Sequence, residues 1–233
     1  MTVVPYGVAL IVGAGPGISA SVARGLAAAG LKVGVAARNI DKLAPLAEEI
    51  GAERFAVDAI DPAAVEHLFE EADARIGVPD VVMYNASARA HGPIAELDPQ
   101  DVRMAVEISA FGGFLVVQQA ARRMIPRGNG AILLTGASAS IKGYRHSAAF
   151  AMGKFALRGL AQSTARELGP QGIHVAHFII DGGVRSARRI DPPDRPDSTL
   201  DPDAIAQTYL EVLRQPRSAW SHEVDMRPWV ETF

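Results

Sequence analysis

The sequence contains no cysteine, which excludes disulfide bonds, thiolate nucleophiles and cysteine-based metal sites. It also lacks an excess of basic charge: the 23 Lys and Arg against 26 Asp and Glu give a net charge of −3, which argues against a nucleic-acid partner. No apolar run approaches the ~20 residues that span a bilayer. No basic region precedes an apolar run at the N-terminus, as it would in a signal peptide. We therefore expect a cytoplasmic protein with neither a membrane nor a nucleic acid as partner.

The six histidines lack the spacing of a metal site. His174 and His177 stand three residues apart in an expected strand, so their side chains point to opposite faces. His67 falls in an expected helix and His91 in a loop. We expect no bound metal.

What the sequence does contain is a large apolar fraction, 48% of 233 residues. This suits one α/β domain over residues 1–233. Short apolar stretches predict strands at 8–12, 31–37, 54–58, 80–86, 131–135 and 174–180. Helical patterns between them begin at Ile18 and cover 40–50, 62–75, 99–123 and 148–168. This alternation predicts a parallel sheet covered by helices on both faces.

The first strand runs directly into glycines 13, 15 and 17, and a helical pattern then begins at Ile18. Such a turn binds anions, because glycines let the backbone approach a diphosphate and the helix N-terminus points free N–H groups at it. The alternative is a tight turn without a ligand. The strand–helix alternation that follows favours a bound dinucleotide.

Several polar residues and a glycine follow the expected strands where ligands bind to such a sheet, outside the carboxyl ends of its strands. They are Gly13, Asp58, Asn85, Ser138 and Asp181. One cleft can therefore collect residues that are far apart in the sequence.

The segment 182–202 is rich in Arg, Asp and Pro and has no periodicity. We expect a mobile loop over the substrate cleft there. A helix over 201–213 then begins a C-terminal extension, 203–233. Its tryptophans, Trp220 and Trp229, are expected to be buried anchors.

Five motifs resemble, in order, those of the short-chain dehydrogenase/reductase family. Val12–Ser19 resembles the family's Thr-Gly-x-x-x-Gly-x-Gly motif, with Ser19 in place of the last Gly, and Asp58 resembles the acidic residue that contacts the adenine edge. Tyr84–Ser87 resembles the Asn-Asn-Ala-Gly motif, and Phe150–Lys154 resembles the Tyr-x-x-x-Lys motif. Asp181-Gly182 resembles the family's Pro-Gly pair. The resemblance extends to about Ser186 and implies a Rossmann-like, doubly wound parallel sheet. It implies a dinucleotide site made by Gly13, Gly15, Gly17, Ile18, Arg38, Asp58, Asn85, Ala86, Ser87, Lys154 and Gly182.

The end of the second expected strand indicates which dinucleotide binds. An acidic residue there would hydrogen-bond the ribose of NAD and repel a 2′-phosphate. That position is Ala37, and Arg38 follows it. A guanidinium beside a phosphate makes a strong charge-assisted pair, so we favour NADP(H) over NAD(H). The alternative is that Arg38 is an ordinary solvated side chain.

The residues that the family uses for catalysis are only partly present. In the family a Tyr donates the proton, a Lys four residues later holds the nicotinamide ribose, a Ser orients the carbonyl, and an Asn holds a water that relays protons. Here Phe150 stands at the Tyr position, Lys154 is present, and Ser109 stands at the Asn position. Ungapped counting places Ala137 at the Ser position, with Ser138 one residue further on. Ser138 is either the catalytic Ser or a turn residue.

Phenylalanine has no proton to donate, so another residue must supply it if the protein reduces carbonyls. Tyr144 and His146 lie in the loop before Phe150 and are candidates. Lys154 could donate through a water if burial lowered its pKa.

The helix that carries Phe150 is apolar almost all round, so it must be buried on more than one side. Together with the helix at 99–123 it predicts a homo-oligomer, a dimer or tetramer. The alternative is burial within one subunit.

Three functions remain open. The first is an NADP(H)-dependent oxidoreductase acting on a small carbonyl or alcohol with a non-standard proton donor. The second is a nucleotide-binding relative without dehydrogenase activity that acts as a sensor, scaffold or partner subunit. The third, a dehydration or isomerisation on the same fold, has no positive support. Arg38 and Lys154 favour the first, and Phe150 favours the second.

Overall fold

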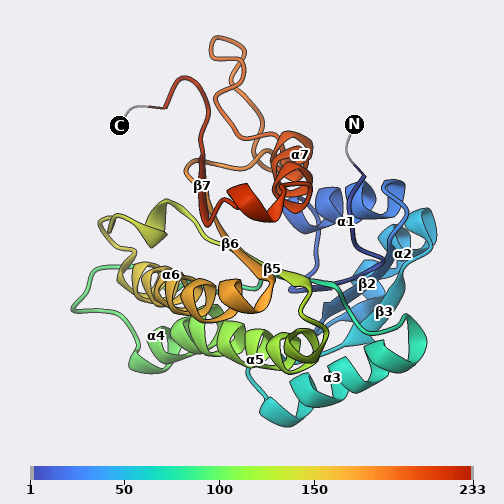
Figure 1. Ribbon diagram of the computed structural model, residues 1–233. Coiled ribbons are helices and arrows are strands. Elements are labelled where there is room, and N and C mark those ends of the chain that lie inside the picture. Colours follow the sequence, from blue (N-terminus) through green and yellow to red (C-terminus); the bar gives the residue numbers. More distant parts are fainter. Residues whose placement is uncertain (1–2, 232–233) are drawn as a thin grey trace.

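A computed structural model describes residues 3–231 and contains a seven-stranded parallel sheet between two layers of helices (Figure 1). The strand order is β3-β2-β1-β4-β5-β6-β7. The strands are β1 (Val8–Val12), β2 (Lys32–Ala37), β3 (Glu53–Ala56), β4 (Val81–Tyr84), β5 (Gly130–Thr135), β6 (Ile173–Ile180) and β7 (Glu223–Met226). The predicted doubly wound parallel sheet is confirmed. Strand β7 was not expected, because it is a short segment of mixed polarity that pairs only at the sheet edge beside β6.

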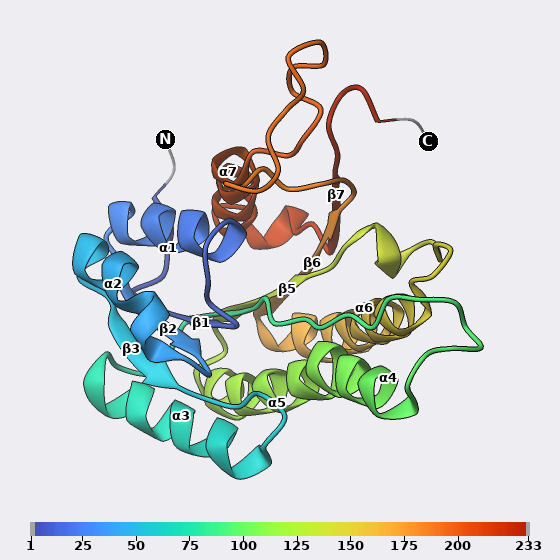
Figure 2. The same ribbon diagram turned by 180° about the vertical axis from the view of Figure 1, so that it is seen from behind.

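The helices lie on both faces of the sheet, as Figure 2 shows from behind. They are α1 (Ile18–Ala28), α2 (Ala44–Ile50), α3 (Pro62–Arg75), α4 (Pro99–Val106), α5 (Gly112–Met124), α6 (Ala148–Leu168) and α7 (Pro202–Leu213). Helices α1, α2 and α7 cover one face, and α3 to α6 cover the other (Figures 1 and 2).

Alternation along the buried strands divides the core into two clusters. Ile11 packs with α1 and α7 residues on one face, whereas its neighbour Leu10 packs with α3 and α5 residues on the other. Both side chains are fully buried. Burying one such side chain contributes about 1.5–3 kcal/mol. The two clusters fix the sheet, and with it the carboxyl ends of the strands.

The helix expected at 99–123 is interrupted by a π-helical turn, Glu107–Phe111, between α4 and α5. The hydroxyl of Tyr84 donates a hydrogen bond to the carbonyl of Ile108 in this turn. The helical segment Pro99–Arg127 contains an 18-residue window with a mean hydropathy of 1.3, so it is long and apolar enough by length and composition to cross a bilayer. The expectation that no stretch approaches this length was therefore wrong. Half of that window is buried inside the protein, where α5 packs on α3 and on the sheet.

The segment 182–202 leaves the carboxyl end of β6 and projects from the body of the protein before α7 (Figure 1). Val184 pairs with Leu200 at its base. The expectation that Trp229 is a buried anchor of the tail was wrong, because Trp229 is 79% exposed. It lies three residues after the end of β7. Trp220 is half-buried and stacks on His174, with ring centroids 4.6 Å apart.

Candidate functional site

The glycine turn after β1 has the geometry that a bound diphosphate needs. Gly13 has a φ of +81°, and a Cβ there would lie 2.3 Å from the backbone nitrogen of Ala86. Gly17 precedes α1 with a φ of +91°, and no side chain caps that helix. The N–H groups of its first turn are therefore available to an anion. The space above Gly15 is open, so a ligand can approach the backbone there.

Two polar side chains hold this turn in place. The Ser19 hydroxyl lies 3.0 Å from both the nitrogen and the carbonyl oxygen of Gly15. The Asn85 side-chain amide donates to the Gly13 carbonyl at 3.3 Å. The substitution of Ser19 for the family glycine thus adds a tie across the turn. Asn85 links the turn to the end of β4.

Two adjoining cavities lie along the carboxyl ends of the strands and share Asn85 and Ser87. The smaller, of about 270 Å³, is lined by the predicted residues Gly13, Arg38, Asp58 and Ala86. The larger, of about 560 Å³, is lined by the predicted residues Ile18, Ser138, Tyr144, Phe150, Lys154 and Gly182. Parallel strands bring these residues together because their carboxyl ends meet at one edge of the sheet.

Lys154 is almost fully buried at the floor of the larger cavity. Its Nζ donates a hydrogen bond of 2.7 Å to the carbonyl oxygen of Thr135 at the end of β5. Burial, with a smaller contribution from the positive charge of Arg89, lowers the pKa of the Lys154 ammonium to about 7. Lys154 can therefore both hold and release a proton near neutral pH.

Phe150 fills the position one turn before Lys154 on α6, and its ring is buried. The Lys154 Nζ lies 5.9 Å from the centre of this ring. The guanidinium group of Arg89 lies over the same ring, with its central carbon 4.1 Å from the ring centre. Two cations therefore border an aromatic ring that has no proton to give.

Ser138 lines the cavity, and its hydroxyl is a hydrogen-bond partner of the Asp181 carboxylate. Lys142 also binds this carboxylate, with an Nζ–oxygen distance of 3.2 Å. Burial alone would raise the pKa of Asp181, but the hydrogen bonds from Ser138 and Lys142 hold it below its usual range. The Ser138 hydroxyl therefore lies beside a charged carboxylate.

Ser109 lies away from both cavities. It is fully buried in the π-helical turn, where its Oγ lies 3.5 Å from the backbone nitrogen of Ala88. A Cβ on Gly153 would lie 2.6 Å from the Ser109 Cβ, so α6 packs closely at this point. These contacts tie the loop after β4 to the helices.

The two residues considered as proton donors in the loop before α6 are placed differently. Tyr144 lines the larger cavity and is 48% exposed. His146 is absent from both cavity linings and packs edge-on against His91, with ring centroids 5.8 Å apart. Tyr144 remains a candidate by position.

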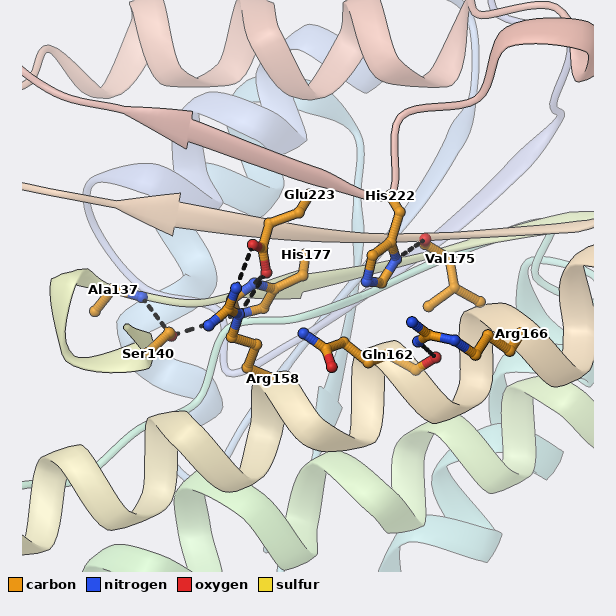
Figure 3. Close-up of polar contacts among 9 residues, drawn as sticks. All are labelled: Ala137, Ser140, Arg158, Gln162, Arg166, Val175, His177, His222 and Glu223. Carbon is orange, nitrogen blue, oxygen red and sulfur yellow. Dashed lines mark hydrogen bonds and ion pairs between the residues drawn. The ribbon is translucent and has the colours of Figure 1, made fainter. Parts of the chain in front are cut away.

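A polar network of buried and half-buried side chains connects β7, β6, α6 and the loop after β5 (Figure 3). The Glu223 carboxylate binds both nitrogens of the Arg158 fork at 2.7 Å and lies 3.2 Å from the Nδ1 of His177. The Nε2 of His177 lies 3.3 Å from the Oγ of Ser140, which accepts from the backbone nitrogen of Ala137. Burial lowers the pKa of His177 to about 4. The network fixes the loop that carries Ser138 relative to α6.

Sequence reasoning missed the cavity roles of Arg89, Arg189 and Thr135. Arg89 follows the Asn85 motif within the same loop, which is a usable signal. Arg189 lies in the segment 182–202, which the sequence places over the cleft, and Thr135 ends β5 at the carboxyl edge of the sheet, so their positions are a usable signal although their residue types are not. Within the described residues no cluster of three or more metal-binding side chains is present.

Comparison with known proteins agrees with this geometry. The family model described as short chain dehydrogenase matches residues 7–190. The chain belongs to this family of oxidoreductases. A D-threitol dehydrogenase of Mycolicibacterium smegmatis is 30% identical over 173 residues, which are 72% of this chain and 66% of that protein.

Solved structures of the family are similar over nearly the whole chain. A short-chain dehydrogenase from Rhodopseudomonas palustris is 37% identical with a TM-score of 0.82, over 96% of this chain and 99% of that one. A metagenomic short-chain oxidoreductase in complex with NADP is 27% identical with a TM-score of 0.83, over 96% and 98% of the two chains.

Proposed function

We propose that this protein is an NADP(H)-dependent oxidoreductase of a small carbonyl or alcohol substrate in which Lys154 is the proton donor. The observation that carries the proposal is the nearly fully buried Lys154 ammonium, with a pKa of about 7, in the cavity beside Phe150. Membership of the oxidoreductase family supplies the reaction class.

The cofactor assignment is supported by residues of the smaller cavity. Arg38 lines it after Ala37, and no acidic residue stands at the end of β2 to repel a 2′-phosphate. Within the described residues, no ion pair or side-chain hydrogen bond engages the Arg38 guanidinium. Gly13 and the uncapped N-terminus of α1 fit a diphosphate. The relative solved with NADP bound supports the same cofactor.

NADP(H), when bound, exchanges a hydride with the carbonyl carbon. The protein must supply one proton to the carbonyl oxygen in reduction. Lys154 gives this proton, directly or through one water, becomes neutral, and regains a proton from solvent. Its neutral form is stabilised by burial, so the transfer needs little driving force. General acid catalysis of this kind contributes on the order of 10²–10⁴-fold in rate.

The test combines NADPH binding with turnover. NADPH binding is measured by fluorescence, and carbonyl reduction is then screened with the wild type, Lys154→Ala and Phe150→Tyr. We expect wild-type turnover, its loss in Lys154→Ala, and continued turnover in Phe150→Tyr. Unchanged turnover and binding in Lys154→Ala would exclude Lys154 from the site.

The second candidate function is a nucleotide-binding protein without dehydrogenase activity. It is favoured by Phe150, whose ring is covered by Arg89 where the family places its proton donor. NADPH binding with no turnover in the wild type, and turnover in Phe150→Tyr, would establish this second function.

We further infer a single domain over 1–233 in which the segment 182–202 is the substrate loop and 203–233 an extension. Gly182, Gly183, Val184 and Arg189 line the larger cavity, which supports this role for the segment. We also infer a homo-oligomer formed through α4, α5 and α6. These helices expose several large apolar side chains, namely Met104, Phe111, Phe114, Met152 and Phe155.

A further inference from the structure

The larger cavity is strongly biased in charge. The charged side chains that line it are Arg89, Arg189 and Lys154, and no Asp or Glu is among its lining residues. Arg89 comes from the loop after β4, and Arg189 from the segment after β6, one hundred residues later. The fold thus brings two guanidinium groups to one cavity without a carboxylate.

Both arginines line the cavity, and both are exposed residues. Arg89 contacts the ring of Phe150, and the Arg189 side chain lies against the backbone of Gly183. Neither forms an ion pair with a described residue. Arg185, on the same segment as Arg189, behaves differently: its guanidinium binds Asp191 at 2.8 Å and Asp201 at 3.2 Å. The segment therefore neutralises one arginine and leaves the other free.

Like charges that share a cavity repel, and the structure contains this repulsion. The pKa of Arg89 is lowered first by burial and then by the charge of Arg189. A bound anion removes the repulsion and accepts hydrogen bonds from both guanidinium forks, which match carboxylate and phosphate oxygens in geometry. An uncharged ligand provides neither gain.

We propose that the substrate is an anion, and that Arg89 and Arg189 bind its carboxylate or phosphate group. The inference rests on the proposed function, since it takes the larger cavity to be the substrate site. It adds the substrate class: a small hydroxylated acid or phosphate ester whose carbonyl or alcohol carbon lies beside Lys154 and Phe150.

The experiment compares ligands of one carbon skeleton. Tartrate and threitol share a four-carbon chain with two secondary hydroxyls. The two ends of tartrate are carboxylates, whereas the two ends of threitol are primary alcohols. Erythritol 4-phosphate against erythritol provides the phosphate comparison. Binding of each to the NADPH-saturated protein is measured by calorimetry. We expect one of the two anions to bind at least about tenfold more tightly than its neutral partner, and the stronger one identifies the anionic group.

The variants are Arg89→Ala, Arg189→Ala and Arg189→Lys, with Arg188→Ala as the control. Arg188 is the exposed neighbour of Arg189 and does not line the cavity. Each cavity variant to Ala should weaken anion binding about tenfold, Arg189→Lys should restore part of it, and the control should change it less than twofold.

Three results would overturn the proposal. The first is equal affinity for the anions and for their neutral partners. The second is an equal loss of anion affinity in Arg188→Ala and in the cavity variants. The third is a loss of NADPH binding alone in the cavity variants, which would assign the arginines to cofactor phosphates. A separate NADPH titration of the wild type keeps the two proposals distinguishable. If the wild type does not bind NADPH, the proposed function is contradicted, and anion binding is then measured on the free protein.

Discussion

At the scale of single residues, Phe150 and Lys154 set the chemistry. The change from Tyr to Phe removes the hydroxyl of the family's proton donor but keeps an aromatic ring, whose centre lies 5.9 Å from the Lys154 Nζ. Burial and the charge of Arg89 lower the pKa of Lys154 to about 7. The proton that the family takes from Tyr is thus available one turn further along α6.

Carbonyl reduction should require protonated Lys154, so kcat should fall as the pH rises through about 7. In Phe150→Tyr this limit should disappear or move to higher pH, because the phenol becomes the donor. Steady-state pH profiles of the two proteins check this. A flat wild-type profile between pH 6 and 8 would contradict the role of Lys154.

Replacing Lys154 should also stabilise the fold. The pKa of Lys154 is about 7 in the folded protein and about 10.5 when unfolded. Between pH 7 and 10.5, folding therefore requires Lys154 to release its proton. The free energy of unfolding therefore decreases because of this group as the pH falls from about 10.5 to 7. The pKa shift corresponds to about 4 kcal/mol at pH 7, and loss of the hydrogen bond from Lys154 to Thr135 offsets part of it, so Lys154→Met should raise the free energy of unfolding at pH 7 by about 1–3 kcal/mol. Denaturant titration measures it, with the exposed Lys32→Met as the control.

Arg38 should determine cofactor preference. In Arg38→Asp the new carboxylate repels the 2′-phosphate of NADPH and can accept hydrogen bonds from the ribose of NADH. We expect NADPH binding to weaken by about tenfold or more while NADH binding is kept or improved. Fluorescence titrations with both cofactors measure this. An equal loss for both would mean that Arg38 does not contact the 2′-phosphate.

At the scale of elements, the pairing of β7 with β6 makes the polar network of Glu223, His177 and Arg158. Glu223 reaches His177 and Arg158 only because β7 adds to the sheet edge beside β6. His177 then holds Ser140 and, through it, the backbone at Ala137. A strand outside the motif region therefore supports the loop that lines the cavity.

Burial of His177 should make stability depend on pH, because it lowers the pKa of this group more than the Glu223 carboxylate raises it. The pKa of His177 is about 4 in the folded protein and about 6.5 when unfolded, so the unfolded state gains a proton as the pH falls below 6.5. Stability should therefore fall between pH 6.5 and 4, by on the order of 3 kcal/mol from this group. His177→Gln should flatten that part of the profile. His67→Gln, on the surface of α3, is the control and should not; equal profiles in both variants would remove His177 as the cause.

At the scale of the whole molecule, the apolar side chains exposed on α4, α5 and α6 point to assembly. Phe111 and Phe114 stack with ring centroids 6.2 Å apart, and Phe155 on α6 is 44% exposed. Burying such rings between two subunits would contribute about 25 cal/mol per Å² of apolar surface. The same helices hold Lys154 and Phe150, so assembly would also stiffen the site.

Phe155→Glu should therefore reduce the molecular mass of the assembly measured by light scattering at micromolar concentration. Ile94→Glu, a control at an exposed loop position, should leave the mass unchanged. A monomeric wild type under these conditions would contradict the assembly.

The sequence by itself determined the parallel sheet, its helices and the ligand end of the sheet, because these follow from local periodicity and from glycines that turn a strand into a helix. It also identified part of the cavity lining, mainly residues that closely follow a strand or lie on α6, such as Asn85, Ser138 and Lys154. Only the tertiary structure decided the pKa of Lys154, the pairing of Ser138 with Asp181, and the meeting of Arg89 with Arg189. It also moved Ser109 out of the cavities and left Trp229 exposed. These properties depend on burial and on contacts between distant segments, which no local pattern encodes.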